Sequence, residues 1–146
     1  MNKLLITSLA LITGSISTLH AESLEERKYW KGQMDYINRG IEEGEKQCGV
    51  KFTFELIDKP KLRAEAAKEN TSPYSICDLI VQEVVSLCRE GEDEKSSVAA
   101  KIKGFQCGYT KPRKLDLSKA GIVKYLGNNE EPNFSAWAKP WLMKKL

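Results

Sequence analysis

Four cysteines are the residues of this 146-residue chain with the greatest capacity for chemistry: Cys48, Cys77, Cys88 and Cys107. Their closest spacing is eleven residues, whereas zinc sites usually pair cysteines two to four residues apart and redox pairs need Cys-x-x-Cys. The only histidine, His20, lies near the N-terminus, so the rest of the chain has no histidine to activate a thiol. The spacing therefore favours structural disulfides, and we expect no metal site and no cofactor.

Paired carboxylates are the other catalytic groups available, because two of them about 5 to 9.5 Å apart can hydrolyse a glycosidic bond. Acidic residues are dense at 42–45 and 90–94. Both runs fall where a helix is expected to end, which is typical of solvated surface. We predict no catalytic residue, and the sequence favours a non-catalytic protein over an enzyme. A small carboxylate-dependent glycan hydrolase or secreted effector remains an alternative.

The C-terminal third is basic, since residues 99–146 contain ten Lys or Arg and three acidic residues, against twelve and seventeen in 22–98. Such a surface can attract anionic polymers. Phe105 and Tyr109 share a strand face with Cys107, which favours burial over stacking on a ligand. A cationic binder of an anionic envelope polymer is therefore a further alternative, with nucleic acid an unlikely ligand class. Its basic face would comprise Lys101, Lys103, Lys111, Arg113, Lys114, Lys119 and Lys124.

The N-terminal residues have the order of a cleavable signal peptide: a positive start at Lys3, an apolar run from Leu4 to about Ile12, and small residues toward Ala21. The apolar run is shorter than the roughly 20 residues that span a bilayer. No cysteine lies near the junction, so a lipid anchor is not expected. We predict cleavage of residues 1–21, a secreted or periplasmic location and no transmembrane anchor. Residues 22–146 would form one disulfide-stabilised domain.

The first half of that domain is expected to contain three helices and a strand. Ser23 begins a capping box, and apolar residues then recur at helical spacing as far as Ile41. Residues 50–56 alternate apolar and polar side chains, which predicts a strand. Residues 61–69 have the composition of a short exposed helix. Residues 73–89 predict the most hydrophobic helix, which we expect at the centre of the core.

The second half is expected to contain a polar loop at 92–97 and three strands at 101–109, 115–117 and 122–126. Their short connections predict an antiparallel meander. A C-terminal helix follows, which Pro140 would kink or divide. The predicted fold class is α+β. An N-terminal helix and a C-terminal helix accompany a central disulfide-stapled core helix, packed on a sheet of about four strands.

Helix geometry limits how the cysteines can pair. Cys77 and Cys88 are eleven residues apart on one predicted helix, about 16 Å, whereas a disulfide needs Cα atoms within roughly 7 Å. If the strands beside this helix run parallel in a right-handed crossover, Cys48 lies next to Cys88 and Cys107 next to Cys77. We therefore predict disulfides Cys48–Cys88 and Cys77–Cys107.

These features together predict a small non-catalytic binding protein of the secreted or periplasmic space. An inhibitor, an immunity protein or an envelope accessory factor would fit them. Its partner would be a protein or an envelope polymer.

Overall fold

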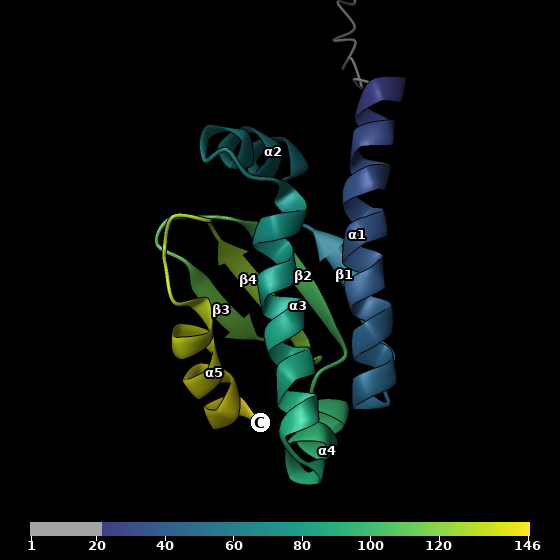
Figure 1. Cartoon of the computed structure of the whole chain (residues 1–146), viewed down its shortest axis with the longest axis vertical. Helices are drawn as coiled ribbons and strands as arrows, with labels where there is room; N and C mark the ends of the chain where they lie inside the picture. The colour runs from purple at the N-terminus through teal and green to yellow at the C-terminus, as the bar shows by residue number, and fades with distance from the viewer. Residues whose placement is uncertain (1–21) are drawn as a thin grey trace, which may run out of the picture.

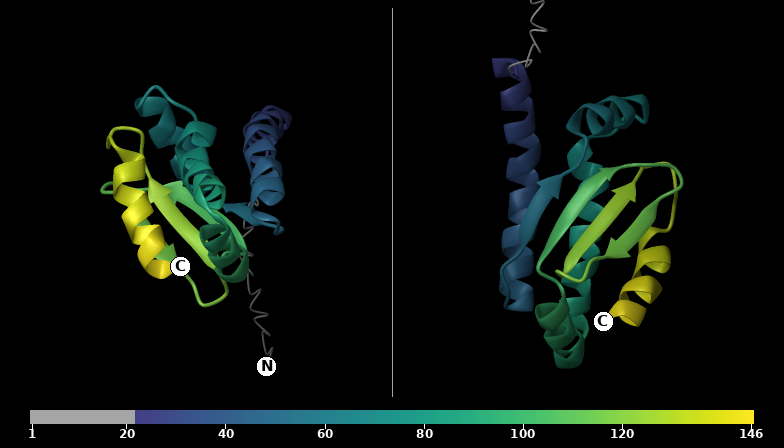
Figure 2. Two further views of the ribbon diagram at one scale, coloured as in Figure 1. Left: turned by 60° about the horizontal axis from the view of Figure 1, so that its bottom comes forward. Right: turned by 180° about the vertical axis from the view of Figure 1, so that it is seen from behind.

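The computed structural model describes residues 22–146, and the predicted leader at 1–21 lies outside the described residues. The fold is α+β, as predicted: α1, α3 and α5 cover one face of a four-stranded sheet whose other face is open (Figures 1 and 2). The elements of this part of the chain are α1 (Leu24–Cys48), β1 (Thr53–Leu56), α2 (Lys59–Lys68), α3 (Pro73–Glu90), α4 (Glu92–Lys101), β2 (Gly104–Tyr109), β3 (Lys114–Leu117), β4 (Ile122–Gly127) and α5 (Phe134–Lys145).

The strand order is β1-β2-β4-β3, with β1, β2 and β4 parallel and β3 antiparallel to β4. The predicted C-terminal antiparallel meander is therefore wrong in one respect, because β4 pairs with β2 and β3 forms the edge. Val123 and Tyr125 of β4 are fully buried, whereas Leu115 and Leu117 of β3 are only partly buried. Burial of the more apolar strand explains why β4 takes the inner position, and a short strand with exposed charges suits an edge.

The sheet register separates a core face from a solvent face. Phe105 and Cys107 of β2 pair with Val123 and Tyr125 of β4, and these buried side chains belong to the core that includes α3. Gln106 lies between Phe105 and Cys107 in the sequence and donates to Glu55 Oε2 of β1 at 2.7 Å. A polar pair on this row is consistent with the open face in Figure 2.

Three local predictions are refined by the structure. The polar loop expected at 92–97 is wrong: this segment is the first part of α4, because its acidic first turn complements the positive end of the helix dipole and Val98 is buried. The helix α2 is largely exposed, as predicted, with seven of its ten residues exposed, but it also buries Leu62 and Ala66 completely. Pro140 lies within a single α5 and does not divide it.

Two disulfides fasten α3 near both of its ends. Cys77 is bonded to Cys107 of β2, with 5.7 Å between Cα atoms, and Cys88 is bonded to Cys48 at the end of α1, with 5.2 Å. These are the pairs that follow from the parallel arrangement of β1 and β2. The core helix is thus joined covalently to the sheet at one end and to α1 at the other.

No helix within residues 22–146 combines the length and the hydrophobicity that a bilayer span requires.

Candidate functional site

Four of the seven residues of the predicted basic face make contacts within the protein. Lys101 donates to the main-chain oxygen of Leu146, and Lys103 donates to that of Ala99. Lys111 and Arg113 belong to a cluster described below. Six of the seven are exposed, and Arg113 is partly buried. Lys101, Lys103 and Lys119 line one groove, so the basic face stays a prediction.

Lys111 and Arg113 tie together the loops that follow β2 and β4. Lys111 contacts Glu69 at 3.1 Å and Glu130 at 2.6 Å. The Arg113 guanidinium donates to the Glu131 main-chain oxygen at 3.0 Å and lies 4.4 Å from the centre of the Trp137 ring of α5. These contacts join α2, both loops and α5, so their role is structural.

Glu69 is the most buried acid of this cluster, with its side chain 2% exposed. Its carboxylate accepts hydrogen bonds from the Tyr109 hydroxyl at 2.7 Å and the Asn129 main-chain N–H at 2.6 Å. Burial alone would raise the pKa of Glu69. The hydrogen bonds from Tyr109 and Asn129, together with Lys111, outweigh burial and hold the pKa below its usual value.

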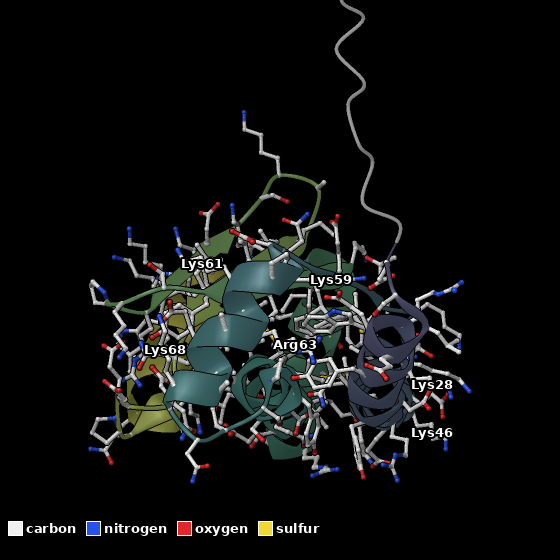
Figure 3. The ribbon with its side chains drawn as sticks, turned by 90° about the horizontal axis from the view of Figure 1, so that it is seen from above. Lys28, Lys46, Lys59, Lys61, Arg63 and Lys68 are labelled. Carbon is white, nitrogen blue, oxygen red and sulfur yellow. A yellow bond between two sulfur atoms is a disulfide. The ribbon has the colours of Figure 1, made fainter. Side chains whose placement is uncertain are left out.

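A second basic region lies on α2, at the end of the molecule seen in Figure 3. Its cations also contact neighbouring side chains. Arg63 lies 4.0 Å from the centre of the Tyr29 ring, and Lys68 contacts Glu65 at 2.7 Å. Arg63 therefore helps to hold α2 against α1. The basic residues of α2 are Lys59, Lys61, Arg63 and Lys68.

The outward side of α3 carries the residues that best fit a binding site. Tyr74, Asp78 and Gln82 are spaced four residues apart, so they form one row along the helix. A groove lies on each side of this row. The α1–α3 groove has a volume of about 420 Å³, and the α3–α5 groove has a volume of about 370 Å³. We call this surface the helical face; its main residues are Tyr36, Arg39, Tyr74, Asp78, Gln82, Glu83 and Phe134.

The α1–α3 groove has an aromatic and cationic rim. Tyr36 is 51% exposed, and its ring centre lies 5.0 Å from that of Tyr74 on α3. The Arg39 guanidinium lies 4.5 Å from the centre of the Tyr36 ring. Gly40 allows the two helices to approach closely, since a Cβ atom there would lie 2.8 Å from Asp78 Oδ1. Large polar and aromatic side chains thus remain accessible above a tight helix contact.

The α3–α5 groove is lined by two carboxylates and two aromatic rings. Glu83 is only 7% exposed and accepts a hydrogen bond from the Ser135 hydroxyl at 3.1 Å. Burial raises the pKa of Asp78, although hydrogen bonds from Gln82 and Tyr74 act in the opposite direction. Tyr74 and Phe134 contribute the aromatic lining. The groove can therefore offer negative charge next to apolar surface.

Two residues of the acidic runs singled out in the sequence form ion pairs between helices. Glu43 pairs with Arg89 at 3.1 Å, and Glu90 pairs with Lys139 at 2.6 Å. Sequence reasoning passed over Asp78 and Glu83, which line the groove instead. The available signal was their position within the most apolar helix, because acidic residues are rarely buried unless they are paired.

Comparison with known proteins gives no functional lead, because no family model, no curated protein and no solved structure matches this chain.

Proposed function

We propose that the chain is a secreted or periplasmic, non-catalytic binding protein that contacts a protein partner through the helical face. The observation that carries this proposal is the pair of grooves that share Tyr74, Asp78 and Gln82. Tyr36 and Arg39 extend the same surface, and tyrosine and arginine are enriched among residues that dominate binding energies. The signal-peptide pattern and the two disulfides support an oxidising compartment.

Site-specific photocrosslinking would test the binding surface. A photoreactive phenylalanine analogue is placed at Tyr36 in one variant and at Lys124, on the sheet, in a control variant. We expect the oxidised Tyr36 variant to crosslink to one discrete protein of its own cell envelope or medium. Excess unmodified protein should compete for that product, and the Lys124 variant should not form it. Equal crosslinking from both positions, or none from Tyr36, would refute the proposal.

The compartment is tested separately by sequencing the N-terminus of the exported protein. We expect the mature chain to begin at Glu22, and the protein to be absent from the cytoplasmic fraction. A cytoplasmic protein that retains residues 1–21 would contradict this part of the proposal.

A glycan hydrolase is the second candidate, because Asp78 and Glu83 both line one groove. A half-buried acid with a raised pKa and a second carboxylate nearby are the groups that such a reaction uses. Purified residues 22–146 should then cleave cell-wall glycan, and Asp78→Asn and Glu83→Gln should each abolish turnover. Lack of turnover by the unmodified protein would exclude this candidate. The anionic-polymer alternative has weaker support, since only three of its seven residues, Lys101, Lys103 and Lys119, line one groove.

A further inference from the structure

The two carboxylates of the α3–α5 groove lack the cationic partners that neighbouring acids have. Glu43 and Glu90 form ion pairs with Arg89 and Lys139. Within residues 22–146, neither Asp78 nor Glu83 forms an ion pair. Removing a carboxylate from water is costly unless a cation or several hydrogen bonds compensate for it. Gln82 and Tyr74 donate hydrogen bonds to Asp78. Both carboxylates nevertheless lack a cation of their own and can accept one from a partner.

Glu83 is the clearest case because it is more than nine-tenths buried. Its Oε1 atom accepts from Ser135, and its Oε2 atom, which receives no hydrogen bond from residues 22–146, is accessible to solvent. The nearby cation Lys139 is bound by Glu90 at 2.6 Å. The groove thus offers an accessible carboxylate oxygen of Glu83 beside Asp78.

The aromatic lining of the α3–α5 groove favours a guanidinium over an ammonium group as the bound cation. A planar guanidinium can stack on an aromatic ring while its N–H groups donate to carboxylates, whereas an ammonium group lacks the flat surface. Tyr74 and Phe134 contribute rings to the same groove as Asp78 and Glu83. We propose that this groove receives an arginine side chain of the partner protein, an inference that rests on the proposed function.

The experiment titrates ¹⁵N-labelled, oxidised residues 22–146 with N-acetyl-arginine amide. The control titrant is N-acetyl-citrulline amide, which has nearly the same shape and no charge. We expect the arginine compound to cause saturable shifts of the amide signals of Asp78, Glu83, Phe134 and Ser135. The citrulline compound should cause much smaller shifts at equal concentration. Equal shifts from both compounds, or shifts spread over the whole surface, would overturn the inference.

Matched variants locate the charge that matters. Loss of a charge-assisted hydrogen bond should weaken arginine binding about tenfold or more in Asp78→Asn. Glu92→Gln, which changes a highly exposed acid on α4, should bind like the unmodified protein. Glu83→Gln provides a second test, with its folded state checked by its amide spectrum. Unchanged arginine affinity in Asp78→Asn would overturn the inference.

The two proposals fail in different ways. If Tyr36 crosslinks to a protein but arginine shows no advantage over citrulline, the helical face binds a partner without an arginine in this groove. If arginine binds selectively but Tyr36 forms no crosslink, the proposed protein-binding role of the helical face fails.

Discussion

Removal of the Cys48–Cys88 disulfide should lower the free energy of unfolding by about 4 kcal/mol. The bond closes a segment whose ends are 40 residues apart, and the chain entropy that such a closure removes from the unfolded state gives this value at 25 °C. Both cysteines are buried, at 1% and 6% exposure, so Cys→Ala replacements avoid an unpaired serine hydroxyl. Urea unfolding followed by tryptophan fluorescence measures the loss. With a slope of about 2 kcal/mol per molar urea, the midpoint should fall by about 2 M.

The other disulfide supplies the matched comparison. Cys77 and Cys107 are 30 residues apart, so the same entropy relation gives about 3.6 kcal/mol for the Cys77→Ala, Cys107→Ala variant. The two variants should therefore lose nearly equal stability. A loss below about 1 kcal/mol from either pair would refute the entropic reasoning. A difference above about 2 kcal/mol between the pairs would show that local packing, and not loop length, dominates.

Three further results are expected from urea unfolding. Gly32→Ala should raise the free energy of unfolding by about 0.5–1 kcal/mol, because nothing lies near the added methyl group. The free energy of unfolding of Gly44→Ala should be about 1–3 kcal/mol lower than that of Gly32→Ala, because its Cβ would lie 2.8 Å from Val85. Equal effects of the two substitutions would contradict this. Because the pKa of Glu69 is lowered in the folded state, the ionised carboxylate stabilises the protein above about pH 4.3, and this stabilisation is lost as the pH falls through the folded-state pKa. Glu69→Gln should therefore lower the free energy of unfolding more at pH 7 than at pH 2.5. A gap that stays constant with pH would refute this. Pro140→Ala should raise the free energy of unfolding by about 1–3 kcal/mol, since proline removes a hydrogen bond inside α5. A loss of stability would show instead that the proline ring contributes packing.

Local periodicity excluded one cysteine pairing, and an assumed right-handed crossover chose between the other two. The apolar spacing of α3 places Cys77 and Cys88 too far apart to join, and this distance does not depend on tertiary structure. The parallel pairing of β1 and β2 then leaves one arrangement of partners. The distance within α3, combined with the assumed crossover, therefore predicted the partners of both cysteines.

Strand order was beyond local reasoning, because it depends on which strand gains more from burial. The short connections between β2, β3 and β4 are compatible with a meander. The structure instead places Val123 and Tyr125 at the inner position, where they contact the core. The strand order depends on the relative burial energies of segments far apart in the sequence. The alternation of apolar and polar residues within each strand does not reveal those energies.

The helical face was hidden for a different reason. Asp78 and Glu83 appear in the sequence as single acids within an apolar helix, and Tyr36 as a single aromatic residue. The α3–α5 groove exists only because the first turn of α5 packs beside α3 and brings Phe134 and Ser135 to those acids. Nothing in residues 73–90 alone indicates that arrangement.

The two grooves of the helical face differ in how firmly their walls are held. Cys48–Cys88 bonds α1 to α3, and Gly44 lets those helices pack closely, so the α1–α3 groove has a covalently fixed wall. No disulfide reaches α5, which is held by the burial of Ala138 and Leu142, by the contact of Arg113 with Trp137 and by the Lys139–Glu90 ion pair. The wall that α5 contributes to the α3–α5 groove therefore depends on packing and one ion pair. A partner that binds across both grooves would contact one wall fixed by a disulfide and one held by packing.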